Sequence, residues 1–174
     1  EFRRVLFRSC LPARRAERCL SRSVDFEFRS GTDIACGLPR YFADPEAAVL
    51  CMSYETAAGR VASWRPGMPA PQELLDHVAA GGLIRGWNVM FEWYCWNTQC
   101  VPKLGWPPLQ IAQLVDSMAE AQAMNLPAAL GKCALALLLD EQHQKSKRGK
   151  QLIKLLCVPQ EEPAVRAPES YGNK

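Results

Sequence analysis

The stretch SVDFEF, residues 23–28, decides the fold class. Polar and apolar side chains alternate along it, which is the period of a β-strand with one buried face. Because successive side chains of a strand point to opposite faces, Phe26 and Phe28 lie on one side, and Asp25 and Glu27 lie on the other. The stretch therefore predicts a strand that packs on a core and presents two carboxylates side by side.

The segments around this strand alternate between strand and helix patterns. In chain order we expect a loop over 31–45, strands over 48–54 and 60–64 joined antiparallel by a turn at Gly59, a helix over 71–78, a strand over 83–87, and helices over 90–94, 111–124, 128–139 and 147–156. This order predicts an α/β fold, with a mixed sheet flanked by helices.

Composition limits the class of protein. The chain has 174 residues, of which 48% are hydrophobic and 22% are charged, which indicates one globular domain and excludes a mainly disordered chain. No apolar run approaches the roughly 20 residues of a membrane span, so we expect no membrane partner. Eight cysteines without a Cys-x-x-Cys pair favour reduced thiols and a cytoplasmic protein over disulfides or a zinc site.

The two ends differ from the middle. The first nine residues, EFRRVLFRS, look like the in-frame translation of a sequencing adapter. We therefore expect residues 1–22 to be an adapter-derived or disordered leader. Residues 159–174 are rich in Pro, Glu, Ala and Arg and are expected to form a loose tail.

Two groups of residues could carry chemistry. Asp25 and Glu27 would repel each other unless a cation lies between them, and hard divalent cations such as Mg²⁺ prefer oxygen ligands. Taken alone, such a pair is more often a solvated strand face. The stretch WNVMFE, residues 87–92, is a strand end followed by a helix that Asn88 can cap and that carries Glu92. Taken alone, it is a capped helix with a surface acid.

Together these groups resemble a known family. The matching motifs are residues 23–30, CGLPRY at 36–41, Asp44-Pro45, WNVMFE at 87–92, DSM at 116–118, LPAALGK at 126–132 and KRGKQLIK at 147–154. In order and spacing they resemble the proofreading 3′→5′ exonuclease domain of phage-type family A DNA polymerases, from about Val24 to Pro159. The resemblance implies a metal-dependent DNA exonuclease of ribonuclease-H-like fold over residues 23–158, which acts on single-stranded 3′ ends beside a polymerase domain in the same chain.

The resemblance also assigns roles to residues. It implies two Mg²⁺ or Mn²⁺ ions, with Asp25, Glu27 and Glu92 as catalytic metal ligands. Asp116 is expected to support the site by capping or hydrogen bonding rather than by ligation. The residues expected to contact nucleic acid are Asn88, Phe91, Lys147, Arg148 and Lys150.

The chain departs from the family at two places. Glu92 stands where many related exonucleases have Asp, which can alter the metal geometry. The fourth acid belongs to a Tyr-x-x-x-Asp motif, whereas Tyr171 is followed only by Gly172, Asn173 and Lys174. We therefore expect a domain that is incomplete at its C-terminus, binds metal weakly and cleaves slowly or not at all. The alternatives are a non-catalytic nucleic-acid-binding or structural remnant, and an unrelated α/β protein whose acids are surface residues.

Overall fold

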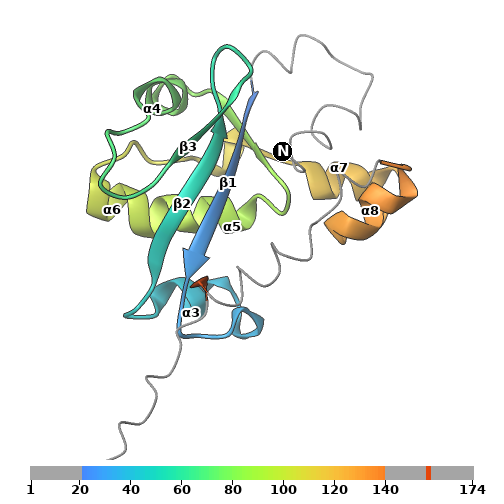
Figure 1. The fold of residues 1–174 in the computed structure, drawn as a ribbon, viewed down its shortest axis with the longest axis horizontal. Coiled ribbons are helices and arrows are strands. Elements are labelled where there is room, and N and C mark those ends of the chain that lie inside the picture. The colour runs from blue at the N-terminus through green and yellow to red at the C-terminus, as the bar shows by residue number, and fades with distance from the viewer. Residues whose placement is uncertain (1–20, 140–155, 158–174) are drawn as a thin grey trace, which may run out of the picture.

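The structure is a computed structural model that describes residues 21–139, 156 and 157. Five strands form one mixed sheet in the order β3-β2-β1-β4-β5 (Figure 1). Their bounds are β1 Ser21–Arg29, β2 Ala48–Glu55, β3 Val61–Trp64, β4 Leu83–Gly86 and β5 Leu114–Asp116. The predicted α/β class is confirmed at this level, as a mixed sheet flanked by helices.

The central strand β1 joins the two halves of the sheet. It pairs antiparallel with β2, which pairs antiparallel with β3, so the predicted hairpin around Gly59 is present. On its other side β1 pairs parallel with β4, and β4 pairs parallel with β5. The carboxyl ends of β4 and β5 therefore lie at the same edge of the sheet, and residues that follow them can meet there.

The core forms on the apolar face of β1. Val24, Phe26 and Phe28 are buried, while the residues between them are only partly buried, as the alternating pattern predicts. The Phe26 ring lies 6.3 Å from that of Trp96, between ring centroids. Aromatic pairs at such distances contribute stability beyond the apolar area that they bury, so this cluster fixes the helices against the strand.

Helices cover the sheet and extend beyond it. The bounds are α3 Leu38–Ala43, α4 Gln72–Ala79, α5 Met90–Cys95, α6 Val101–Leu104, α7 Ser117–Ala123 and α8 Leu130–Ala136, with a π-helical turn, η2, at Trp96–Cys100 between α5 and α6. Figure 1 shows α7 and α8 together at one side of the sheet. They bury a small cluster of their own, centred on Ala121, Cys133 and Ala134.

The segment 31–45 was expected to be a loop, and this prediction is wrong. It contains a 3-10 turn, η1, at Ile34–Cys36, and the helix α3. Pro39 lies in the first turn of α3, where the missing N–H of proline costs no helical hydrogen bond. The proline therefore marks the start of a helix here instead of a break.

Asp44 directly follows α3 and ties the end of this segment back to its beginning. Its carboxylate accepts hydrogen bonds from the Thr32 hydroxyl at 2.6 Å and from the Glu46 amide at 2.8 Å. The Thr32 hydrogen bond first, and then the Glu46 amide, lower the pKa of Asp44 below its ordinary value of 3.8. These bonds favour the ionised form in the folded state.

This depressed pKa predicts a pH-dependent contribution of Asp44 to stability. The contribution is fully present above 3.8 and is lost as pH falls through the lower folded-state pKa. Asp44→Asn should therefore lower the urea midpoint of unfolding at neutral pH. The difference in midpoint between the variant and wild type should become smaller at about pH 3. An equal gap at both pH values would show that the charge of Asp44 contributes nothing.

The expected helix over 111–124 is also wrong in its first half. Ile111–Gln113 forms a 3-10 turn, η3, residues 114–116 form strand β5, and only then does α7 begin. The strand exists because Leu114, Val115 and Asp116 pair with three residues of β4. Asp116 then caps α7, so the helix starts where a capping side chain is available.

Within residues 21–139 and 156–157, no helix has the length and apolar character needed to cross a membrane. The six cysteines in these ranges are free thiols. The leader was expected to extend to residue 22, but Ser21 and Arg22 belong to β1, where they pair with Leu83 and Ile84 of β4. Residues 1–20, the tail over 159–174 and the expected helix over 147–156, except its last residue, lie outside the described residues.

Candidate functional site

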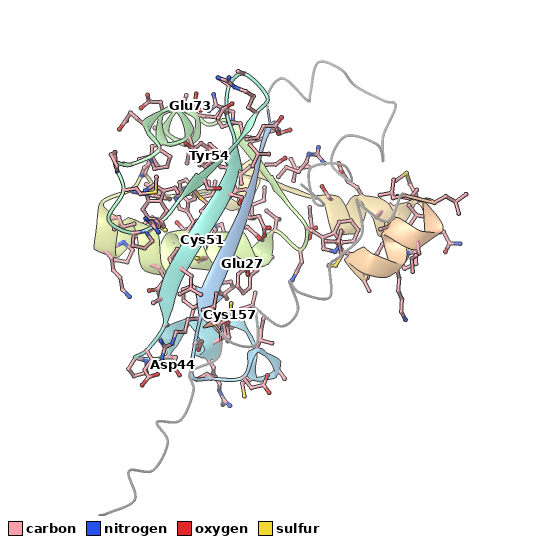
Figure 2. The ribbon with its side chains drawn as sticks, viewed as in Figure 1. Glu27, Asp44, Cys51, Tyr54, Glu73 and Cys157 are labelled. Atoms are coloured by element: carbon pink, nitrogen blue, oxygen red, sulfur yellow. The ribbon has the colours of Figure 1, made fainter. Side chains whose placement is uncertain are left out.

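The two acids of β1 lie on the face opposite the core. Asp25 and Glu27 are partly buried and alternate with the buried Val24, Phe26 and Phe28. Glu27 lies directly across from Cys51 of β2, and Asp25 lies across from Ser53. Figure 2 shows Glu27 and Cys51 on the neighbouring strands, with Cys157 close to Glu27. The face therefore gathers two carboxylates and two thiols.

The charges of these acids act on the neighbouring thiols. Burial raises the pKa of the Cys51 thiol, and the negative charges of Glu27 and Asp25 raise it further. Burial likewise raises the pKa of the Cys157 thiol, with Glu27 as the next cause. A negative charge disfavours formation of a thiolate nearby, so both thiols stay protonated at neutral pH.

Cys157 brings a distant part of the chain to this face. Its carbonyl oxygen accepts a hydrogen bond from the Ser30 amide at 3.3 Å, just past the end of β1. The amide of Phe28 donates to the Cys157 thiol, an interaction that favours the thiolate but is outweighed by burial. Neither Cys51 nor Cys157 was expected at the site, and their only signal in the sequence is the apolar run around each.

Glu92 lies in a different environment from the β1 acids. It belongs to the first turn of α5, and its side chain is only 2% exposed. A Cβ atom added to Gly86 at the end of β4 would lie 3.3 Å from Oε2 of Glu92. The carboxylate is therefore held against the end of β4, where the absence of a side chain on Gly86 leaves room for it.

Cys95, one turn further along α5, responds to this buried acid. Burial raises the pKa of its thiol well above the ordinary value, the neighbouring Cys100 raises it further, and the charge of Glu92 adds to both. Glu92 is thus a carboxyl group buried near the Cys95 thiol, an environment in which ionisation is costly. Glu92 is therefore not the surface acid on a capped helix that the stretch 87–92 suggests when taken alone.

Asn88 does not cap α5, contrary to expectation. Val89 occupies the capping position, and no side chain there makes a capping hydrogen bond. Asn88 instead adopts a left-handed backbone conformation, with φ of 59°, and its carbonyl accepts from the Phe91 amide at 3.0 Å. Asn tolerates this conformation better than most residues. Its exposed side chain projects from the tight turn between β4 and α5.

Asp116 makes the capping and hydrogen-bonding contacts that we expected of it. Its Oδ1 atom accepts from the Met118 amide at 2.9 Å, at the start of α7, and from the Asn88 amide at 3.0 Å. In the parallel pairing of β4 with β5, Asp116 lies beside Gly86. One carboxylate oxygen therefore ties the connection after β4 to the helix after β5.

Of the remaining residues expected to contact nucleic acid, only Phe91 lies among the described residues. Phe91 packs among the rings of Phe28, Tyr41 and Phe42, at centroid distances from 5.1 to 6.5 Å, and remains partly exposed. The described residues do not include the basic set Lys147, Arg148 and Lys150.

The three acids can be tested against the metal ions that the resemblance implies. All are carboxylates, the ligands that Mg²⁺ and Mn²⁺ prefer, so the donor chemistry fits. In the described ranges, however, no three or more His, Cys, Asp or Glu side chains are gathered as a metal-binding group. The type of side chain therefore suits these metal ions, but the three acids do not form a complete ligand set. Two of them lie on β1, and the third lies near the end of β4.

Comparison with known proteins gives no assignment: no family model matches the chain, and no curated protein matches it significantly. Any function must therefore be argued from the arrangement of the residues.

Proposed function

We propose that the chain is the 3′→5′ exonuclease part of a DNA polymerase, which engages the 3′ end of single-stranded DNA with the help of divalent cations. The observation that carries the proposal is the placement of three carboxylates on adjoining elements. Asp25 and Glu27 lie on the central strand β1, and Glu92 is buried at the end of β4, the parallel neighbour of β1.

The topology supports a ribonuclease-H-like fold. The strand order β3-β2-β1-β4-β5, antiparallel from β1 to β3 and parallel from β1 to β5, is the order of ribonuclease-H-like sheets. Because one fold hosts many functions, this strand order is compatible with a nuclease but does not by itself assign that function. The acids of the central strand are the part of the proposal that can be tested.

Each group would have a distinct task. Asp25, Glu27 and Glu92 would hold Mg²⁺ or Mn²⁺, which supplies an activated water and neutralises charge at the phosphate during hydrolysis. The exposed side chain of Asn88, in the turn beside Glu92, would hydrogen-bond the DNA end. The basic residues Lys147, Arg148 and Lys150 would contact the phosphate backbone, which makes binding weaken as salt is raised.

The proposal predicts that Mn²⁺ stabilises the protein through the β1 acids. An ion that binds only the folded state raises the unfolding temperature. Asp25→Asn combined with Glu27→Gln should weaken the apparent Mn²⁺ affinity by at least about 10-fold. Metal sites lose about that much affinity even when the replaced residue only hydrogen-bonds to a ligand. Mn²⁺ titrations followed by thermal unfolding measure this affinity, with release of 3′-labelled nucleotides from single-stranded DNA as a second readout.

The matched control is Glu46→Gln, which neutralises an acid whose side chain is 63% exposed, outside this site. It should respond to Mn²⁺ as wild type does. Salt-dependent DNA binding without release of nucleotides would favour the non-catalytic, nucleic-acid-binding alternative. Absence of both Mn²⁺ stabilisation and DNA binding in wild type would refute the proposal.

A further inference from the structure

Two connections leave the same edge of the sheet and are joined by one side chain. The connection from β4 to α5 carries Asn88, and the connection from β5 to α7 begins at Asp116. Oδ1 of Asp116 accepts from the backbone amides of Asn88, at 3.0 Å, and Met118, at 2.9 Å. Because hydrogen bonds to a carboxylate are roughly twice as strong as neutral ones, this contact restrains both connections.

The connection that Asp116 restrains leaves little freedom for Glu92. Gly86 ends β4, Asn88 turns the chain through a left-handed conformation, and Glu92 follows in the first turn of α5. A Cβ on Gly86 would lie 3.1 Å from Cγ2 of Val89 and 3.3 Å from Oε2 of Glu92. A side chain at Gly86 would therefore be crowded by both residues, which shows that Val89 and the Glu92 carboxylate lie close to the end of β4. Since the turn at Asn88 leads directly into the helix of Glu92, we expect a shift of this turn to move the carboxylate.

We infer that Asp116 is a positioning residue for Glu92 and that Asp116 acts through the backbone of Asn88. The inference rests on the proposed function for its importance, since Glu92 is the acid that would complete the set with Asp25 and Glu27. Asp116 itself uses Oδ1 for the two amides and holds the turn in place. It thus couples the edge strand β5 to the geometry of the site.

The variant Asp116→Ala tests this role in two ways. Without metal, its crystal structure should show the Glu92 carboxylate displaced from Gly86 relative to wild type. In Mn²⁺ titrations followed by thermal unfolding, its apparent affinity should fall by about 10-fold, the lower end of the range for residues that orient metal ligands. Asp116→Asn keeps the accepting oxygen and should retain most of the affinity.

The control is Asp33→Ala, which removes another capping side chain. Asp33 accepts from the Ala35 amide at 2.8 Å, at the start of η1 in the segment after β1. Both alanine variants should lower the unfolding temperature, but Asp33→Ala should leave the Mn²⁺ affinity and the position of Glu92 unchanged. Gly86→Ala should weaken Mn²⁺ binding by crowding Glu92 while leaving the Asp116 hydrogen bonds in place.

The outcomes separate this inference from the proposed function. An Asp116→Ala structure in which Glu92 has not moved overturns the inference, whatever the metal response. If Glu92 moves but wild type shows no response to Mn²⁺, the positioning role stands and the metal-dependent function fails. If wild type responds and Asp116→Ala binds Mn²⁺ equally well, Asp116 is only a helix cap.

Discussion

Replacing Trp96 by Ala should lower the free energy of unfolding by about 3–5 kcal/mol, the usual cost of removing a large aromatic side chain from a core. Trp96 is fully buried, and its ring lies 4.8 Å from that of Trp106 and 6.3 Å from that of Phe26. Its Nε1 atom donates to the carbonyl of Pro107 at 2.8 Å. The substitution therefore leaves a cavity and removes a partly buried hydrogen bond.

Urea unfolding measures the loss, and two variants calibrate it. Trp96→Phe keeps most of the ring but removes the hydrogen bond to Pro107, so it should cost much less than Trp96→Ala. Ile111→Ala removes apolar atoms from a side chain that is 64% exposed and should change stability by less than about 0.5 kcal/mol. A loss below about 1 kcal/mol for Trp96→Ala would contradict the packing described for this core.

Trp96 also links stability to the candidate site. It follows α5 directly, so the contact between Trp96 and Phe26 fixes the helix of Glu92 against the strand of Asp25 and Glu27. The carboxylates project from elements whose relative position is set by this aromatic contact. If the protein binds Mn²⁺ as proposed, a partial loss of packing at Trp96 should weaken that binding as well as lower stability.

Local patterns predicted the parts of the fold that local physics determines. The alternation over residues 23–28 placed Asp25 and Glu27 on one face of a strand, because side-chain direction in a strand follows from sequence position alone. The hairpin of β2 and β3 was predicted for the same reason, from two apolar runs around Gly59. These predictions did not require knowledge of any distant contact.

Features that depend on distant contacts were missed. Strand β5 has three residues, too few to show a period, and it exists through pairing with β4. The burial of Glu92 depends on the close approach of Gly86, and the left-handed turn at Asn88 depends on Asp116, which is 28 positions away. A sequence pattern that favours Asn as a helix cap cannot distinguish this arrangement.

The second large effect is expected at Gln113, a buried residue that the sequence did not single out. Its Nε2 atom donates to the carbonyls of Val78 and Gly82, each at 2.9 Å, and its Oε1 atom accepts from the Gln110 amide at 3.0 Å. The side chain is 7% exposed. Gln113→Ala should cost about 2–4 kcal/mol, because each buried group that loses its partner costs about 1–3 kcal/mol and water recovers part of the loss.

Two variants separate hydrogen bonding from volume at this position. Gln113→Met keeps the volume but loses the three hydrogen bonds, so it should remain nearly as destabilising as Gln113→Ala in urea unfolding. Gln122→Ala makes the same truncation at an exposed position of α7 and should change stability by less than about 0.5 kcal/mol. Wild-type stability in Gln113→Met would show that the three hydrogen bonds contribute nothing.

The consequence of losing Gln113 should extend to the sheet edge. Gln113 immediately precedes β5, and its bonds to Val78 and Gly82 tie that strand to the end of α4 and the start of β4. Asp116 is the last residue of the same three-residue strand. Hydrogen exchange should therefore accelerate at the amides of Asn88 and Met118 in Gln113→Ala, because both are held by Asp116. Unchanged exchange there would show that β5 is fixed by its pairing with β4 alone.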